Sequence, residues 1–212
     1  VWVSSEAKAG QDAGRLAGLD RDLGVVATND RDALLALRPD CIVHAAMTDD
    51  RVPEAIEDLI GFAEAGINVV SSGPVILQFP YDVLPDAYIA RIDTAAKAGG
   101  VSIHVNGIDP GFANDALPLA MTSLSQRIDE LRCQEIADYS TYYQPVVMSE
   151  LFGFGKPMDA TPPLVVPQVL TLAWGSVVRQ LAAGLGVTLD EPLDVRVERV
   201  AADRDYSTVS VE

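Results

Sequence analysis

The sequence predicts a doubly wound α/β domain with a parallel sheet, followed by an α+β domain. Short runs rich in β-branched residues recur at residues 1–3, 24–28, 41–45, 67–71 and 101–105. Segments with helical spacing separate these runs, and strands that alternate with helices are typical of a parallel sheet with right-handed crossovers. The alternation stops after residue 108. We therefore predict a first domain at residues 1–108 and a second domain at residues 109–212.

Helix signals occur in three segments of the first domain. Asp30 can cap a helix whose apolar run ends at Pro39. Residues 52–65 place apolar side chains on one stripe and acidic side chains opposite, which is the pattern of an amphipathic helix. Residues 86–97 repeat this pattern before two glycines. We expect these helices to connect the strands.

The second domain has a different pattern. Helical spacing occurs at residues 114–125 and again in the apolar segment 167–185. Residues 127–139 alternate like an exposed strand, and residues 193–201 and 205–212 alternate like the two strands of a hairpin. Helices and antiparallel strands that no longer alternate predict an α+β domain, which we expect to contact the substrate.

The composition excludes several classes of function. The 212 residues include 31 acidic and 15 basic side chains, for a formal charge of −16. A protein that neutralises nucleic-acid phosphates needs a basic patch, and no run of this sequence concentrates Lys or Arg. No stretch approaches the roughly 18 consecutive apolar residues of a membrane span. We predict a cytoplasmic protein without nucleic-acid or membrane partners.

The cysteines and histidines predict no metal site. Cys41 and Cys133 are far apart, which excludes a CxxC redox pair and a cysteine-based zinc knuckle. We expect both thiols to be buried and inert in a reducing compartment. His44 and His104 lie in or beside predicted strands, and we expect both to be core residues rather than proton shuttles.

The two ends of the chain predict an excerpt of a longer protein. Residues 1–3 look like the end of a strand already under way, and residues 206–212 look like a strand whose continuation is absent. No GxGxxG turn follows a strand, because Gly10, Gly14 and Gly18 lie in a segment too polar for that turn. Either this domain never bound a dinucleotide, or its first strand and glycine loop lie upstream. The second alternative fits a start in mid-strand.

Candidate ligand-binding residues follow the strands, because ligands of open parallel sheets bind outside the carboxyl ends of the strands. The residues there are Ser4, Ser5, Lys8, Ala45, Ala46, Met47, Ser71, Ser72, Gly73, Asn106, Pro110 and Gly111. Ordinary loops favour the same small and polar types, but four such loops in register favour a shared ligand. If residues 1–3 are the second strand, the two serines and Lys8 meet the adenosine ribose and favour a 2′-phosphate. This predicts NADP as the cofactor, with NAD as the alternative because Glu6 is close.

One segment resembles a known family. Residues 107–118, GIDPGFANDALP, are similar to the GxNPGFxxDxLP element of the dihydrodipicolinate reductase-like NAD(P)-dependent oxidoreductases, in the branch with 2,4-diaminopentanoate dehydrogenase and the native amine dehydrogenases. Residues 26–32, 40–46 and 66–72 also resemble this family, and the resemblance covers most of the chain, loosely after residue 145. It implies an NAD(P)-binding Rossmann domain and hydride transfer to a C=O or C=N carbon. It also implies a second domain that contacts a small-molecule carbonyl or amine substrate and packs in a homodimer or homotetramer.

The sequence departs from this family at three places. It lacks the His-His and Lys motif of dihydrodipicolinate reductase, so reduction of a dihydropyridine dicarboxylate is not expected. Residues 71–80 lack the glutamate that handles ammonia and imine in the amine dehydrogenases, and a cationic iminium needs a base or counter-charge. Asp109 stands where the family usually has Asn. It can accept from the nicotinamide carboxamide, or it can restore the missing carboxylate.

Aromatic and acidic residues supply the remaining candidates. Tyr139, Tyr143 and Asp109 are the predicted catalytic residues, because a tyrosine hydroxyl can protonate the oxygen formed by hydride transfer to a carbonyl. An aromatic strand end at an interface is the alternative for the tyrosines. Asp115 is also placed to cap a helix, and Trp174 lies in an apolar helix expected in the core or at an oligomer interface. The predicted substrate-lining residues are Phe112, Asp115, Phe152 and Phe154.

These observations predict an NAD(P)H-dependent oxidoreductase that transfers hydride to a small carbonyl or imine. One alternative within this class is an amine dehydrogenase, which forms an amine from a ketone or aldehyde and ammonia. The other alternative is a non-catalytic, degenerate Rossmann protein that binds a nucleotide or a partner. The absent glycine loop and the missing glutamate favour this last alternative.

Overall fold

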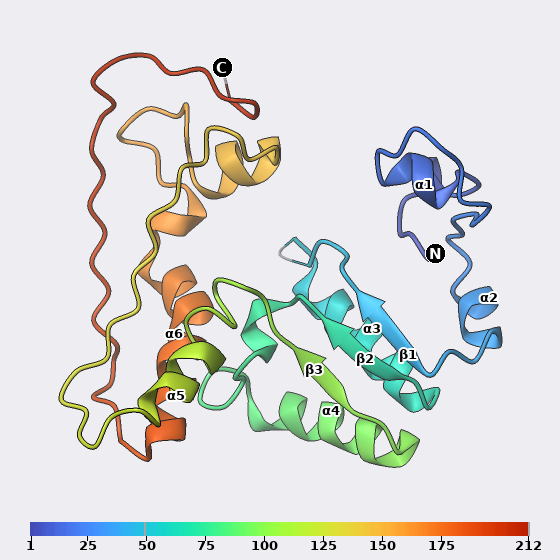
Figure 1. Ribbon diagram of the computed structural model, residues 1–212, viewed down its shortest axis with the longest axis horizontal. Helices are drawn as coiled ribbons and strands as arrows, with labels where there is room; N and C mark the ends of the chain where they lie inside the picture. Colours follow the sequence, from blue (N-terminus) through green and yellow to red (C-terminus); the bar gives the residue numbers. More distant parts are fainter. Residues whose placement is uncertain (49, 212) are drawn as a thin grey trace. The chain divides into compact units, whose positions relative to one another are not determined.

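The computed structural model describes residues 1–48 and 50–211, and the chain divides into two compact units (Figure 1). Unit 1 consists of Val1–Pro74 and Pro85–Asn106, and unit 2 consists of Val75–Leu84 and Gly107–Glu212. The chain therefore leaves unit 1 for one short segment and then returns to it before the last strand of its sheet.

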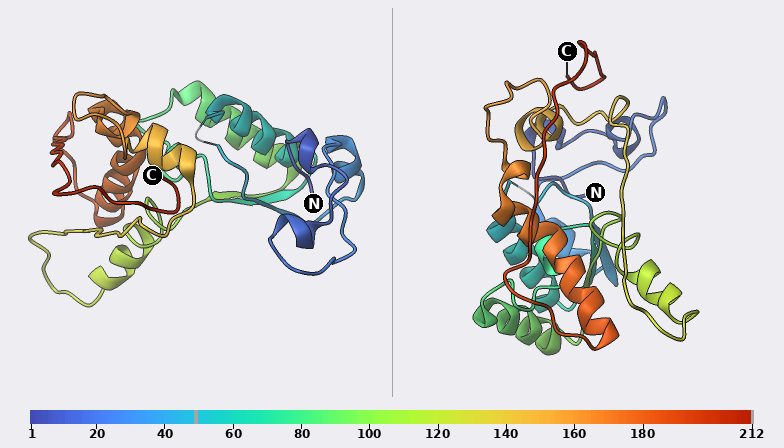
Figure 2. Two further views of the ribbon diagram at one scale, coloured as in Figure 1. Left: turned by 90° about the horizontal axis from the view of Figure 1, so that it is seen from above. Right: turned by 90° about the vertical axis from the view of Figure 1, so that its left-hand side faces the viewer.

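A parallel sheet forms the centre of unit 1 and confirms the predicted α/β class. The strands are β1 (Cys41–His44), β2 (Asn68–Ser71) and β3 (Ile103–Val105), in the order β1-β2-β3. Val43 pairs with Val70, which pairs with His104. Helices α3 (Val52–Glu64) and α4 (Asp86–Gly99) connect the strands and lie on one face of the sheet (Figure 2).

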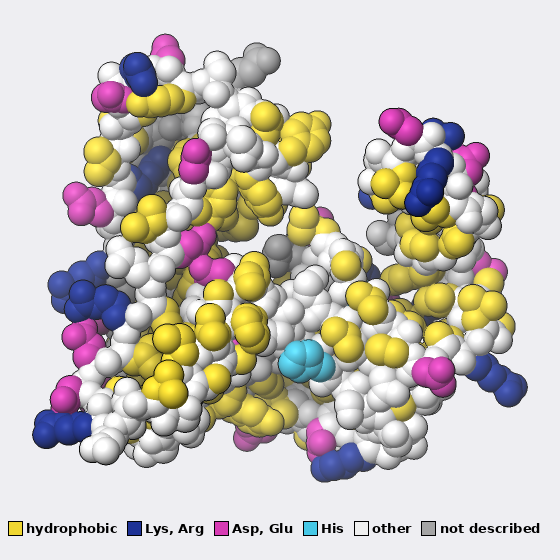
Figure 3. Space-filling view, in the orientation of Figure 1, with side chains coloured by type: hydrophobic (Ala, Val, Ile, Leu, Met, Phe, Trp, Pro, Cys, Tyr) yellow, Lys and Arg dark blue, Asp and Glu magenta, His cyan; other side chains and the backbone are white. Residues whose placement is uncertain are grey.

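The two faces of the sheet differ, because the helices of unit 1 cover one of them. Val69 is 1% exposed on the covered face, whereas Val43 on the opposite face is 80% exposed. In Figure 3 hydrophobic side chains lie exposed over the strands. A doubly wound sheet has helices on both faces, so this finer part of the fold stays a prediction.

The open face also corrects two sequence-based expectations. His44 points to the covered face and is buried, as expected, but His104 is exposed and is not a core residue. Cys41 and Cys133, which were expected to be buried, are both exposed. For Cys41 the reason is the alternation of side chains along β1, which places it on the same open face as Val43.

Helix α3 carries much of the core of unit 1. Phe62 is 0% exposed, and its ring packs edge-on against Trp2, with 6.1 Å between the ring centroids. The Arg31 guanidinium lies over the same ring, 5.0 Å from its centroid. Helices α3 and α4 approach closely, because a Cβ on Gly99 would lie 2.0 Å from the carbonyl oxygen of Ala63. Only glycine fits this approach without a shift of the backbone.

The N-terminal part of unit 1 has isolated bridges in place of the two strands predicted there. Residues 1–3 and 24–28 are joined by one parallel bridge, between Trp2 and Thr28. Neither run becomes a strand, and Val26 is 61% exposed, so little burial holds this pairing. The short helices of this part are α1 (Ala13–Leu16) and α2 (Arg31–Ala36).

Unit 2 is built around helix α6 (Pro167–Leu185), whose bounds are those predicted. Pro167 lies in the first turn, and Gly186, with a φ of 66°, ends the helix. Helix α6 packs against α5 (Ala116–Thr122). It also packs against two one-turn helices, at Val75–Leu77 and Pro163–Val165. A π-helical turn spans Val147–Leu151. Across the described residues, no helix combines the length and apolar character needed to cross a membrane.

The runs predicted as strands of unit 2 form no strand within residues 107–211. They follow irregular paths, visible as long connections in Figure 1. Ile136 is 89% exposed and Val200 is 81% exposed, so their side chains gain no burial that would favour a ladder. The α+β class of the second domain therefore stays a prediction.

Candidate functional site

Unit 2 presents the carboxylate of Asp109 from a tight turn. Gly111 has a φ of 145°, which favours glycine, and its N–H donates to Asn114 Oδ1 at 2.8 Å. The side-chain amide of Asn114 in turn donates to Asp109 Oδ1. The indole N–H of Trp174, on α6, donates to the same oxygen at 3.0 Å. The segment that resembles the family element thus folds into a turn whose carboxylate is held by two N–H groups.

Glu135 and Tyr139 extend this turn into a carboxyl cluster, which consists of Asp109, Asn114, Glu135, Tyr139 and Trp174. The carboxyl group of Glu135 is hydrogen-bonded to that of Asp109, and the Tyr139 hydroxyl donates to Glu135 Oε1 at 3.1 Å. The hydrogen bond to Asp109, together with partial desolvation and the charge of Asp109, raises the pKa of Glu135 above its ordinary value. Burial, followed by the hydrogen bond to Glu135, raises the pKa of Tyr139 to about 12. Tyr139 therefore keeps its proton at neutral pH.

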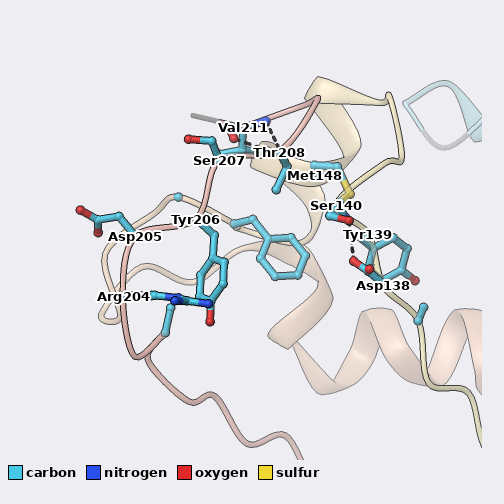
Figure 4. Close-up of a pocket in the computed structure, with 14 residues that line it drawn as sticks. Asp138, Tyr139, Ser140, Met148, Arg204, Asp205, Tyr206, Ser207, Thr208 and Val211 are labelled. Carbon is cyan, nitrogen blue, oxygen red and sulfur yellow. Dashed lines mark hydrogen bonds between the residues drawn. The ribbon is translucent and has the colours of Figure 1, made fainter.

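The ring of Tyr139 also forms one wall of a cavity of about 710 Å³ in unit 2 (Figure 4). It packs edge-on against Phe152, with 5.1 Å between the ring centroids. Phe154, Met148 and Tyr206 line the same cavity. The Tyr139 side chain thus joins two features, because its hydroxyl belongs to the carboxyl cluster and its ring lines a cavity of the size that small organic ligands occupy.

The structure brings together two of the three predicted catalytic residues. Asp109 and Tyr139 are linked through Glu135. Tyr143 is 72% exposed and is not a member of the carboxyl cluster. No group of three or more His, Cys, Asp or Glu side chains within residues 1–48 and 50–211 is arranged to hold a metal ion.

The four predicted substrate-lining residues have different surroundings. Phe154 lines the cavity and Phe152 packs against the Tyr139 ring. Phe112 is 51% exposed in the turn that carries Asp109. Asp115 is fully buried and caps α5, because its Oδ1 accepts from the N–H of the next residue.

Three residues of the carboxyl cluster are not among the predicted site residues, namely Asn114, Glu135 and Trp174. The sequence held one signal for Glu135. Cys133, Glu135 and Tyr139 are separated by even numbers of positions in the run that alternates like a strand. Such residues lie on one side of an extended chain. Cys133 Sγ accordingly lies 3.7 Å from the Asn114 carbonyl oxygen. Although the residue is exposed, partial desolvation of its thiol, together with the charge of Asp109, raises the pKa of that thiol.

In unit 1 the predicted ligand residues gather where the parallel strands end. The N–H of Ser72 donates to the carbonyl oxygen of His44 at 3.1 Å, and the N–H of Asn106 donates to that of Ser71 at 3.0 Å. Ser71 Oγ lies 2.8 Å from His44 Nδ1 and is buried, so this hydroxyl is engaged within the protein. Burial lowers the pKa of His44. Asn106 Oδ1, in contrast, is buried and has no hydrogen-bond partner among the described residues.

The other predicted cofactor residues form three groups. Ser4, Ser5 and Lys8 lie at the one-turn helix Glu6–Lys8, where Ser4 and Lys8 are exposed. Ala45, Ala46 and Met47 follow β1, and Met47 is 47% exposed. Gly73 follows β2, whereas Pro110 and Gly111 belong to the turn of unit 2 that carries Asp109.

Comparison with known proteins identifies relatives of this chain. It is 44% identical over 208 residues to an amine dehydrogenase from Streptomyces virginiae, a match that covers 98% of this chain and 57% of the relative. It is 26% identical over 161 residues to a 2,4-diaminopentanoate dehydrogenase from Acetoanaerobium sticklandii, and this match covers 74% of this chain and 44% of that protein. The chain therefore spans about half the length of these curated relatives. No protein-family model matches it.

A solved structure has the same fold over the region compared. The amine dehydrogenase from Mycobacterium smegmatis superposes with a TM-score of 0.60 and 23% identity, over 88% of this chain and 54% of that chain. The resemblance noted in the sequence is therefore confirmed, and this chain is a homologue of amine dehydrogenase and 2,4-diaminopentanoate dehydrogenase.

Proposed function

We propose that this protein is an NAD(P)H-dependent oxidoreductase that acts as an amine dehydrogenase and forms an amine from a small carbonyl compound and ammonia. The observation that carries the proposal is the 44% identity to an amine dehydrogenase over 98% of this chain. The proposal concerns the whole protein, because the chain spans only 57% of that relative.

The strand ends of unit 1 fit a nicotinamide cofactor. Asn106 Oδ1 is a buried acceptor without a partner among the described residues, and it suits a ligand N–H such as that of a carboxamide. Gly73 approaches Thr48 so closely that a Cβ would lie 2.4 Å from Thr48 Oγ1, so this loop carries no side chain toward its neighbour. Ser5 and Lys8 support NADP over NAD. When bound, the cofactor supplies the hydride.

We also propose that a further parallel strand pairs with the open edge of β1 and that a glycine loop follows this strand. A cavity of about 280 Å³ is lined by Val1 and Trp2 on one side and by β1 on the other. Trp2 Nε1 and His44 Nε2, whose residues line it, are buried and lack partners among the described residues. The backbone of an added strand can satisfy such groups. The loop would complete the pyrophosphate site at the start of a helix.

The carboxyl cluster of unit 2 supplies the negative charge that amine chemistry needs. An iminium carbon is positive, and a carboxylate beside it stabilises it. Residues 71–80 hold no carboxylate, and Asp109 provides one elsewhere. The cavity beside Tyr139 would receive the organic part of the substrate, with Phe154 as an apolar wall. Packing of the second domain in a homodimer or homotetramer belongs to the same proposal.

Reduction of a carbonyl without ammonia is the second candidate, because Tyr139 keeps its proton at neutral pH and can protonate an alkoxide. The test is ketone-dependent NADPH oxidation by the full-length protein, with and without ammonium. The amine dehydrogenase proposal predicts oxidation that requires ammonium, whereas equal rates would establish a carbonyl reductase. A protein that neither oxidises NADPH nor binds it in a fluorescence titration would be the non-catalytic alternative.

A further inference from the structure

We propose that Glu135 is the proton donor of the carboxyl cluster and that it shares a single proton with Asp109. After ammonia has added to a carbonyl substrate, Glu135 delivers this proton to the hydroxyl group, which leaves as water. The catalytic role rests on the proposed function, whereas the shared proton does not.

The geometry of the cluster places the proton on Glu135. Asp109 Oδ1 accepts two hydrogen bonds, from Trp174 Nε1 at 3.0 Å and from the Asn114 amide, and both favour negative charge on Asp109. Glu135 accepts one hydrogen bond from a neutral hydroxyl, that of Tyr139 at 3.1 Å. Two adjacent carboxyl groups resist carrying two negative charges, so the less well stabilised group holds the proton.

The pair has no cationic ion-pair partner within the described residues. Neither Asp109 nor Glu135 takes part in an ion pair with Lys or Arg. The titratable groups that face the pair are Tyr139 and Cys133, and Tyr142 lies beside Tyr139. The raised pKa of Glu135 agrees with this arrangement. The side chain of Glu135 is exposed, so a ligand can reach it.

The proposed step is the loss of water from a carbinolamine, the adduct of ammonia and the carbonyl carbon. Glu135 gives its proton to the hydroxyl oxygen, the C–O bond breaks and water leaves. The nitrogen lone pair forms the C=N bond, which produces an iminium cation and leaves Glu135 as a carboxylate. Two carboxylates then face one cation. Before the step the charge of Asp109 keeps Glu135 protonated, and after the step the same charge stabilises the iminium product.

The rest of the proposed reaction consumes one hydride and returns the proton to Glu135. A bound dihydronicotinamide would supply the hydride that turns the iminium ion into a neutral amine, and it would itself be oxidised. The next ammonium ion returns a proton to Glu135 and becomes the ammonia that attacks the next carbonyl. In this scheme Tyr139 is a positioning residue, because its hydroxyl holds Glu135 Oε1 while its ring is fixed by Phe152.

The shared proton is tested without any catalytic assay. The carboxyl carbons of glutamate are labelled with ¹³C in the full-length protein, and their NMR shifts are followed against pH. The resonance of Glu135 is the one that disappears in Glu135→Gln. We expect it to titrate well above the ordinary glutamate pKa of about 4.3 and to move back toward that value in Asp109→Asn. Titration in the ordinary range, or the same titration in both proteins, would refute the shared proton.

The catalytic role is tested with ketone, ammonium and NADPH. We expect Glu135→Gln to lower kcat by about 100-fold or more with little change in the KM for the ketone. Because Asp109→Asn removes the charge that holds the proton on Glu135, we expect the high-pH limb of its kcat profile to move to lower pH. Glu130→Gln is the matched control, since Glu130 lies on the same segment and pairs with Arg132 at 2.6 Å. It should retain the full kcat.

The outcomes separate the two proposals. Unchanged kcat in Glu135→Gln, with wild-type activity present, would overturn the role of Glu135 while the proposed function stands. A wild-type protein that performs no ammonium-dependent oxidation of NADPH would overturn the proposed function and the role of Glu135 together. The NMR titration decides the shared proton in either case.

Discussion

The hydrogen bond between Trp174 and Asp109 is the contact whose removal most directly tests the architecture of the carboxyl cluster. Trp174→Phe keeps an aromatic ring on α6 but deletes the N–H that donates to Asp109 Oδ1 at 3.0 Å. A hydrogen bond to a charged group contributes about 1.5–3 kcal/mol to stability. Both side chains are partly exposed, so we expect the lower part of this range, about 1.5 kcal/mol.

The assay is urea unfolding followed by far-UV circular dichroism, with Trp174→Phe, Asp109→Asn and the double variant compared in a cycle. An asparagine oxygen at position 109 can still accept from the indole, so the cycle measures the extra strength that the charge gives, about 1 kcal/mol. A coupling energy of zero within about 0.3 kcal/mol would refute this account of the cluster, because the indole would then not recognise the charge of Asp109.

Three further predictions concern unit 1. Gly99→Ala should lower stability by about 1–3 kcal/mol in thermal unfolding, because the Cβ of the alanine would lie 2.0 Å from the Ala63 carbonyl oxygen. Helix propensity alone predicts the opposite, so a stabilised variant would contradict the close approach of the two helices. Phe62→Ala should cost about 3–5 kcal/mol in urea unfolding, since the ring is 0% exposed, and a cost under about 1 kcal/mol would contradict its place in the core. Hydrogen bonds from backbone N–H groups, of which that of Leu23 has the largest effect, lower the pKa of Asp12 below its ordinary value of 3.8. The stability that the Asp12 carboxylate adds is therefore present above pH 3.8 and is lost as the pH falls through the pKa of the folded state. Asp12→Asn should remove this acid-dependent loss in a circular dichroism titration, and an unchanged titration would show that the carboxylate is not engaged.

The helices could be predicted from the sequence because their signals are local. Helix α6 begins at Pro167 and ends before Gly186, and both residues act through their own backbone conformation. Asp30 caps α2 as predicted, since its carboxylate accepts from the N–H of Ala33 at 3.0 Å. The strands β1, β2 and β3 were predicted because each lies in a short run rich in β-branched residues between segments with helical spacing.

Features that depend on distant partners could not be predicted in the same way. A run such as 127–139 alternates like a strand, but alternation does not say whether a neighbouring strand exists to pair with it. His44 and His104 occupy similar runs, and only the packing of α3 and α4 on one face decides which of them is buried. Trp174 lies far along the chain from Asp109, and no local pattern links an indole of an apolar helix to a carboxylate in a turn.

The incorporation of labelled ammonia tests the central claim most directly. The full-length protein is given a ketone, NADPH and ¹⁵N-ammonium, and the product is identified by mass spectrometry. The account predicts an amine that carries ¹⁵N, formed in proportion to the NADPH oxidised. An alcohol as the product, with no ¹⁵N incorporated, would contradict it.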